Sequence, residues 1–235
     1  MQAIILAGGF GTRLQSVVKN CPKPMAPIHG KPFLAYLIEY LKLQGITRVV
    51  LSVHYLREQI EEFFKESYQG IEIRYAVEEQ PLGTGGAIVH ALKEIDSTKP
   101  VFILNGDTFL KLDYRAMYAE HQKSLPVLTM ALRKIADCSR YGVVMTAGKE
   151  ITAFGEQGGA YPGLINAGVY LMDPMLFQKF PIGEQVFSFE RDFLSSQINQ
   201  LKSQAFIADD YFIDIGVPED YAQITKDFAC KSEIA

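Results

Sequence analysis

A glycine-rich segment near the start of the chain contains residue types suited to binding phosphate. Ala3 to Ala7 is a short apolar run, which predicts a strand buried on both faces. It is followed by Gly8-Gly9-Phe10-Gly11-Thr12-Arg13, whose glycines allow positive φ and let another group approach the backbone N–H groups closely. A loop of this kind at the carboxyl end of a first strand is where open α/β sheets hold nucleotides. Arg13 adds a planar cation whose shape matches phosphate oxygens.

Two other phosphate-binding motifs are excluded. A dinucleotide fingerprint, G-x-G-x-x-G, would use Gly9 and Gly11 but has Leu14 where the third glycine belongs, which argues against a nicotinamide dehydrogenase. A P-loop needs Gly-Lys-Ser/Thr after four free positions, and the sequence has no such triplet. Taken alone, the glycine segment could equally be a tight turn without a ligand.

The segment Asn20-Cys21-Pro22-Lys23-Pro24-Met25 follows, and its prolines present Lys23 from a stiff stretch of backbone. Gly-Gly-x-Gly-Thr-Arg-Leu followed closely by Pro-Lys-Pro resembles the signature of the sugar-1-phosphate nucleotidylyltransferases. The resemblance implies a Rossmann-like nucleotidyltransferase fold in which Arg13 and Lys23 are catalytic and contact the phosphates of a nucleoside triphosphate. It assigns nucleotide binding to Leu6, Ala7, Gly8, Gly9, Gly11, Thr12, Glu78, Gln80, Gly83 and Thr84.

Two acidic residues follow or lie within predicted strands. Asn105-Gly106-Asp107 ends the predicted strand Val101–Leu104, so the carboxylate of Asp107 is expected at the same sheet edge as the glycine loop. Asp214 lies between Ile213 and Ile215, an unusual place for a charge with only a structural task. A turn former is the alternative for Asp107. Magnesium takes one or two protein carboxylates plus substrate phosphates, and the resemblance implies that these two residues share Mg²⁺.

A second glycine-rich stretch, Glu78 to Ala87, opens a predicted helix over Gly85 to Ile95. A helix amino end with free N–H groups accepts polar or anionic ligands. The alternative is that its three glycines only ease the packing of the helix onto the sheet. The stretch resembles the family's base-and-sugar loop, in which Gln80 would meet a base edge.

Three later segments resemble the sugar-binding half of the family: Arg140-Tyr141-Gly142-Val143, Asn166-Ala167-Gly168-Val169-Tyr170 and Phe187-Ser188-Phe189-Glu190. The resemblance implies sugar-phosphate binding by Gly106, Tyr141, Gly142, Glu156, Asn166 and Glu190. A turn, a polar residue on an edge strand and a helix cap are the alternatives. The family usually has a lysine where this chain has Gln157. Either the acceptor is held differently, or the missing charge comes from one of Arg133, Lys134, Arg140 and Lys149.

Strands and helices alternate four times in the first half, which predicts an α/β fold with a mostly parallel mixed sheet flanked by helices. The predicted strands are Ala3–Ala7, Val49–Val53, Ile71–Val77 and Val101–Leu104, and the predicted helices are Pro32–Gln44, Leu56–Phe64 and Gly85–Ile95. The second half is less regular, with strands predicted over 127–132, 141–145, 150–154, 165–171 and 212–215 and helices over 114–123, 187–200 and 219–228. The 235 residues predict one nucleotidyltransferase domain, with a nucleotide-binding half to about residue 110 and a smaller mixed sugar-phosphate-binding half from about residue 111.

Composition narrows the functional class. A net charge of −4 argues against a nucleic-acid surface, and no apolar run is long enough for a membrane span or preceded by a charged leader. Three cysteines without metal-ligand spacing predict reduced thiols in a cytoplasmic protein, and the four histidines also lack ligand spacing. The sequence is also compatible with a homo-oligomer.

The reaction implied by the resemblance is attack of a sugar-1-phosphate oxygen on the α-phosphorus of a nucleoside triphosphate, with release of pyrophosphate. The nucleophile is mostly ionised at neutral pH, so no Ser-His-Asp or Cys-His set is needed. Within the family, the sequence most resembles guanylyltransferases acting on D-glycero-α-D-manno-heptose 1-phosphate, in residues 81–88, 165–170 and 213–221. This resemblance makes GTP the expected nucleotide. Mannose-1-phosphate guanylyltransferases and short uridylyl- and thymidylyltransferases are the alternatives within the family. A catalytically silent regulatory subunit is the alternative of a different class.

Overall fold

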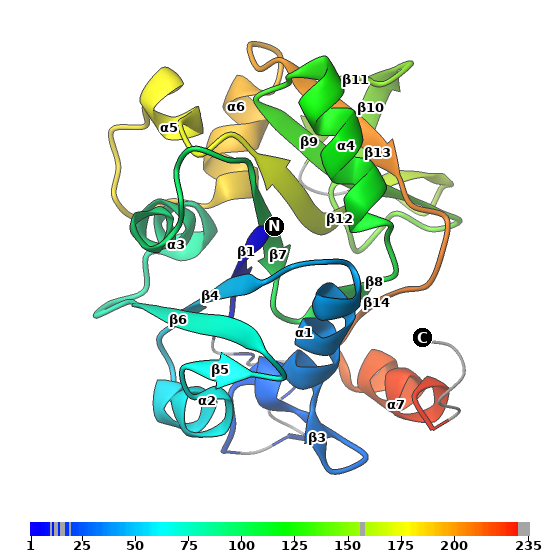
Figure 1. Ribbon diagram of the computed structural model, residues 1–235. Helices are drawn as coiled ribbons and strands as arrows, with labels where there is room; N and C mark the ends of the chain where they lie inside the picture. The colour runs from blue at the N-terminus through cyan, green and yellow to red at the C-terminus, as the bar shows by residue number, and fades with distance from the viewer. Residues whose placement is uncertain (10, 12–13, 15–16, 19, 156–157, 230–235) are drawn as a thin grey trace.

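The computed structural model describes residues 1–9, 11, 14, 17–18, 20–155 and 158–229. Within these residues, ten strands form one mixed sheet with helices packed on both faces, which confirms the predicted α/β class (Figure 1). In spatial order the strands are β10 (Val143–Ala147), β11 (Glu150–Gly155), β13 (Ser203–Ile207), β9 (Leu128–Ile135), β12 (Gly163–Met172), β7 (Val101–Asn105), β1 (Gln2–Leu6), β4 (Arg48–Val53), β6 (Ile71–Val77) and β5 (Ser67–Tyr68).

The first half of the chain supplies the parallel part of this sheet. Strand β1 pairs in parallel with β4 on one side and β7 on the other, and β4 pairs in parallel with β6. Ile4 of β1 packs in the core on one face of the sheet, whereas Ala3 and Ile5 pack in the core on the other face. The expectation of a first strand buried on both faces is therefore confirmed.

The helices divide between these two faces. One face carries α1 (Phe33–Leu43), α2 (Arg57–Phe64), α4 (Tyr114–Ser124) and α7 (Pro218–Asp227). The other carries α3 (Gly83–Ala91), α5 (Leu176–Lys179), the π-helical turn η4 (Phe189–Leu194) and α6 (Ser195–Gln197), as Figure 1 also shows. The 3₁₀ turns η2 (Lys23–Met25) and η3 (Leu92–Glu94) and the small hairpin of β2 (Pro27–Ile28) and β3 (Lys31–Pro32) complete the connections in the first half.

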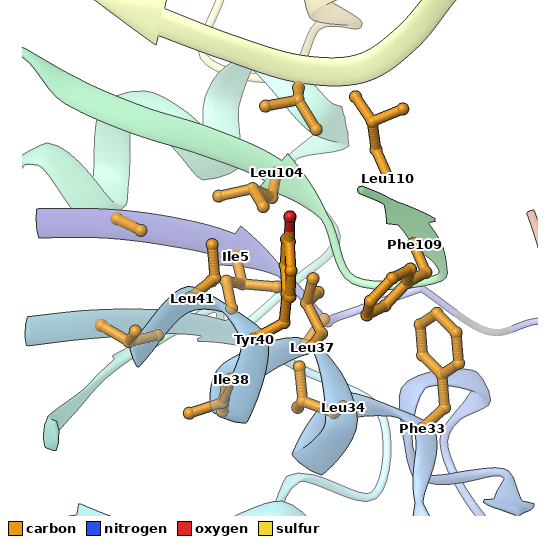
Figure 2. Close-up of a cluster of buried hydrophobic side chains, with 14 of the residues drawn as sticks. Ile5, Phe33, Leu34, Leu37, Ile38, Tyr40, Leu41, Leu104, Phe109 and Leu110 are labelled. Atoms are coloured by element: carbon orange, nitrogen blue, oxygen red, sulfur yellow. The ribbon is translucent and has the colours of Figure 1, made fainter. Parts of the chain in front are cut away.

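The core beneath α1 shows why this helix forms where the sequence predicts it. Figure 2 shows Leu37 and Tyr40 of α1 together with Ile5 of β1 and Leu104 of β7, all of them buried. The Tyr40 hydroxyl donates to the backbone carbonyl of Leu112 at 3.0 Å, so its one polar atom is satisfied inside the core. The apolar stripe of α1 therefore fixes the helix on the parallel strands.

Strand β12 joins the second half to the first. It pairs antiparallel with β7 and with β9, so one sheet runs continuously through both halves. The β12–β9 register shifts between Asn166 and Tyr170, and Gly168 within this bulge has φ +69°. A separate pair, β8 (Thr108–Leu110) and β14 (Phe212–Asp214), lies antiparallel and brings the end of the chain back to β7.

Several features of the fold differ from the sequence predictions. The continuous helix expected over 187–200 is instead η4 followed by the short α6. In the helix predicted over Leu56–Phe64, the sequence pattern places Ile60, Phe63 and Phe64 on the inner side, but Phe63 of α2 is 40% exposed. Strand β13 was not predicted, although it pairs in parallel with β9 inside the sheet. In the described parts of the chain, every helix is too short or too polar to span a bilayer.

Candidate active site

The glycine loop leaves β1 at the carboxyl edge of the parallel strands. The Ala7 N–H donates to the Ser52 carbonyl at 2.8 Å, which anchors the start of the loop to β4. Gly11 has φ +59°, and a Cβ atom there would lie 2.7 Å from Cβ of Lys23, so only glycine fits. Thr12 and Arg13, which were assigned to nucleotide binding and catalysis, lie outside the described residues.

Lys23, Asp107 and Asp214 meet at this edge. The Lys23 Nζ lies 2.5 Å from Oδ2 of Asp107 and 3.4 Å from Oδ1 of Asp214. The lysine side chain is only 10% exposed, against 33% for Asp107 and 27% for Asp214. Three residues that are far apart in sequence thus form one cluster of two carboxylates around a single ammonium group.

Backbone pairing holds the two carboxylates side by side. Asp107 lies in the turn between β7 and β8, and Asp214 ends β14 in register with Thr108. The Ile215 N–H donates to the Asp107 carbonyl at 3.0 Å. Ile213 and Ile215 are buried, as their alternation around Asp214 predicts.

The electrostatics of the pair suit a divalent cation. Burial raises the pKa of Asp214, the neighbouring charge of Asp107 raises it further, and the Lys23 ammonium opposes both. Two carboxylates that repel each other unless a cation lies between them are a suitable donor set for a hard metal ion. Among the described residues, no cluster of three or more His, Cys, Asp or Glu side chains could hold a metal ion by itself. Substrate oxygens or water would therefore have to complete the coordination.

A cleft of about 300 Å³ opens beside the acidic pair. It is lined by Leu6, Gly8, Gly9, Glu78, Pro81, Gly83, Thr84, Ala87, Asn105 and Asp107. The structure thus brings together six residues that were assigned to nucleotide binding, from β1, the glycine loop, the position after β6 and the start of α3. Gln80 is exposed and does not line the cleft. The sequence analysis missed Asn105, although it directly precedes the Gly-Asp motif.

Glu78 shapes the cleft through both of its carboxylate oxygens. Oε1 accepts from the Ser52 hydroxyl at 2.8 Å, and Oε2 accepts from the Leu82 N–H at 3.0 Å. The side chain is buried and its Oε1 would lie 3.1 Å from a Cβ atom at Gly8. Glu78 therefore fixes the loop before α3 against the glycine loop.

The sequence predicted free N–H groups at the amino end of α3, and this prediction is wrong for Gly85 and Gly86. The Gly85 and Gly86 N–H groups both donate to the Phe187 carbonyl, at 2.9 and 3.4 Å, and are not free for a ligand. A Cβ atom at Gly85 would lie 2.0 Å from the Phe187 ring, and one at Gly83 would lie 2.5 Å from the Phe187 carbonyl oxygen. The glycines let the segment before η4 lie directly on α3, whereas the alternative was packing of the helix onto the sheet.

The described residues assigned to the sugar phosphate come from four places: Gly106 from the turn after β7, Tyr141 and Gly142 from the segment before β10, Asn166 from β12 and Glu190 from η4. The Gly106 N–H donates to the Leu6 carbonyl at 3.0 Å, and a Cβ atom there would lie 2.6 Å from the same oxygen. The Asn166 N–H donates to the Gly142 carbonyl at 2.9 Å, which brings two assigned residues together. Glu156 lies outside the described residues, as does Gln157.

Tyr141 packs against β14, the strand that ends in Asp214, and Arg140 lies beside Tyr141. The Tyr141 ring packs on Phe212 with centroids 5.7 Å apart, and the Arg140 guanidinium lies 5.6 Å from the Tyr141 ring centroid. Burial raises the pKa of Tyr141 and the charge of Asp214 raises it further, whereas Arg140 lowers it. Arg140 also contacts Asp220 of α7 at 2.5 Å.

A glycine loop and a lysine-bridged acidic pair at the carboxyl edge of a parallel sheet are features of a transferase that acts on nucleotides. The chain belongs to the nucleotidyl transferase family, whose model matches residues 2–231, and it is an enzyme of that class.

Among its relatives, the D-glycero-alpha-D-manno-heptose 1-phosphate guanylyltransferase of Aneurinibacillus thermoaerophilus is 47% identical over 227 residues, covering 97% of this chain and 98% of the relative. The protein with the same name from Campylobacter jejuni subsp. jejuni serotype O:2 is 48% identical over 222 residues, covering 94% of this chain and 97% of the relative. The crystal structure of HddC from Yersinia pseudotuberculosis complexed with GMP-PN is 36% identical, with a TM-score of 0.84, covering 97% of this chain and 99% of that one.

Proposed function

We propose that this enzyme joins D-glycero-α-D-manno-heptose 1-phosphate to GTP and releases pyrophosphate. The observation that carries the proposal is the convergence of Lys23, Asp107 and Asp214 beside the cleft lined by Gly8 and Gly9. Two relatives that carry the name of this activity match nearly the whole chain, and a structural neighbour was solved with a guanine nucleotide analogue.

In the proposed reaction, an oxygen of the sugar phosphate attacks the α-phosphorus of GTP. The new P–O bond forms as the bond to the β-phosphate breaks, and pyrophosphate leaves with its electron pair. The attacking phosphate is already ionised at neutral pH, because its second pKa is about 6. The protein therefore has to position the two phosphates and offset their charge.

Each part of the site has a place in this reaction. The backbone of Gly8 and Gly9 would line the nucleotide, and Lys23 would pass from the carboxylates to the phosphates. Asp107 and Asp214 would hold Mg²⁺, which neutralises phosphate charge when bound. The assignment of Arg13 to the phosphates remains a prediction from the sequence.

Arg140 is our candidate to replace the family lysine that is missing at Gln157. Its hydrogen bond to Asp220 raises the pKa of its guanidinium, and Asp214 is close enough to add to that shift. By contrast, Lys149 pairs with Glu120 at 2.5 Å and lies in the turn between β10 and β11. Arg140 also lies beside Tyr141, which was assigned to the sugar phosphate.

A screen of pyrophosphate release with GTP, UTP, dTTP and CTP against three sugar 1-phosphates tests the proposal. We expect GTP with the manno-configured heptose 1-phosphate to give the highest kcat/KM, and mannose 1-phosphate to be a weaker substrate. Glucose 1-phosphate should be worse, since its inverted 2-hydroxyl leaves a buried partner unpaired at about 1–3 kcal/mol. A preference for UTP or dTTP with glucose 1-phosphate would refute the heptose assignment and leave the reaction class intact.

A further inference from the structure

A chain of side-chain hydrogen bonds links the nucleotide cleft to the sugar half of the site. The Asn166 Nδ2 donates to the Tyr170 hydroxyl at 2.6 Å, and the Tyr170 hydroxyl donates to Oε1 of Glu190 at 3.0 Å. The Thr84 hydroxyl donates to Oε2 of Glu190 at 2.6 Å. Thr84 lines the cleft, whereas Asn166 lies in the bulge of β12, so the chain of bonds spans three elements.

The direction of every bond in this chain is fixed. Oδ1 of Asn166 accepts from the Gly168 N–H at 3.0 Å, so its amide nitrogen must be the atom facing Tyr170. Glu190 accepts on both carboxylate oxygens, with the Ser188 hydroxyl 3.3 Å from Oε2 as a further donor. Tyr170 is fully buried and can satisfy its hydroxyl only within this network.

The same side chains also fix the backbone around η4. The Phe189 N–H donates to the Thr84 hydroxyl oxygen at 2.8 Å, and the Phe189 ring packs edge-on against the Tyr170 ring with centroids 5.1 Å apart. Because Thr84 both donates to Glu190 and accepts from Phe189, it fixes the position of the Glu190 carboxylate relative to α3. Thr84 and Tyr170 therefore orient Glu190, although neither residue belongs to the sequence motif that contains it.

We propose that Tyr170 and Thr84 are positioning residues that hold Asn166 and Glu190 in the geometry needed for the sugar phosphate, an inference that rests on the proposed function. Loss of the Tyr170 hydroxyl leaves the Asn166 amide held at one end only and removes a donor from Glu190. The expected consequence is weaker binding of the sugar phosphate, with little change in binding of the nucleotide.

The decisive comparison is Tyr170→Phe with Tyr114→Phe. Both tyrosines are fully buried, but among the described residues the Tyr114 hydroxyl has no hydrogen-bond partner. For Tyr170→Phe we expect KM for the sugar 1-phosphate to rise about tenfold, as for loss of a hydrogen bond to a charged group, with KM for the nucleotide changed less than about twofold. Tyr114→Phe should leave both KM values as in the wild type, because it removes no hydrogen bond.

Substitutions at Thr84 give a second test that does not depend on the buried tyrosine. Thr84→Val keeps the shape but loses the hydroxyl, whereas Thr84→Ser keeps the hydroxyl. We expect Val to raise KM for the sugar phosphate more than Ser does, because only Val loses the hydrogen bonds of the hydroxyl to Glu190 and Phe189. Melting temperatures of all four variants separate loss of stability from loss of positioning.

The outcomes distinguish this inference from the proposed function. The inference is overturned if the wild type turns over a sugar 1-phosphate but Tyr170→Phe has the same KM values as Tyr114→Phe. It is also overturned if Tyr170→Phe lowers only the melting temperature, or if Thr84→Ser is as impaired as Thr84→Val. Absence of turnover by the wild type with every substrate pair would refute the proposed function and this inference with it.

Discussion

Replacing Lys23 with methionine should have opposite effects on the metal-free and the metal-bound enzyme. In the metal-free state, the substitution leaves Asp107 and Asp214 facing each other without the ammonium group that lies 2.5 and 3.4 Å from them. Breaking a fully buried pair costs about 3–5 kcal/mol, and partial exposure of the carboxylates reduces this to about 2–3 kcal/mol. For a chain of this length, that loss corresponds to a fall in Tm of about 4–12 °C.

Added Mn²⁺ should reverse that loss, because a divalent cation no longer has to displace the lysine. We expect Lys23→Met to bind Mn²⁺ at least about tenfold more tightly than the wild type in the absence of nucleotide. Thermal melts in chelator and in Mn²⁺, together with calorimetric titration of Mn²⁺, measure both effects without relying on activity. Lys31→Met is the matched control, since Lys31 pairs at 2.6 Å with a single carboxylate, that of Glu39. An unchanged metal-free Tm and an unchanged Mn²⁺ affinity would refute the reasoning.

Three further predictions test the site and its support. Asp107→Asn and Asp214→Asn should each lower turnover at saturating Mg²⁺ by about two decades or more with the fold retained by circular dichroism, and near-normal rates would remove that residue from the metal site. Gly85→Ala should lower stability by about 1–3 kcal/mol in denaturant melts, because its Cβ would lie 2.0 Å from the Phe187 ring, and an unchanged midpoint would contradict this packing. Burial lowers the pKa of His121 to about 4, so the unfolded chain binds the proton first and stability is lost as pH falls from about 6.5 towards 4. His121→Asn should flatten this part of the stability profile, and an equal slope in both proteins would contradict the assignment.

The parts of the fold that sequence could predict are those specified locally. The run Ile71–Val77 is β6 residue for residue, and Val49–Val53 differs from β4 by one residue. Val49–Val53 is an almost wholly apolar run, and Ile71–Val77 starts with apolar and charged residues in alternation. Each pattern specifies a strand from local sequence alone. Asp214 could be singled out in the same way, because a charge between two buried isoleucines is unusual without a partner.

The parts that could not be predicted depend on distant partners. Strand β13 begins with the buried polar residues Ser203 and Gln204, and only its pairing with β9 makes it a strand. The Gly85 and Gly86 N–H groups look available in sequence, but both donate to the carbonyl of Phe187, which is far away in the chain. The π-helical turn η4 likewise depends on contacts of Glu190 with other elements, which no local pattern records.

The pairing of β8 with β14 also decides when the acidic pair can form. Lys23 precedes Asp107 by 84 residues and Asp214 by 191, so the cluster closes the longest loops in the site. Contacts of such long range slow folding, because chain entropy is lost before the contact forms. As the chain leaves the ribosome, β1, β4, β6 and β7 can pair long before β14 exists. If the acidic pair acts as proposed, we therefore expect the reaction only from molecules in which β14 has been made and has paired with β8.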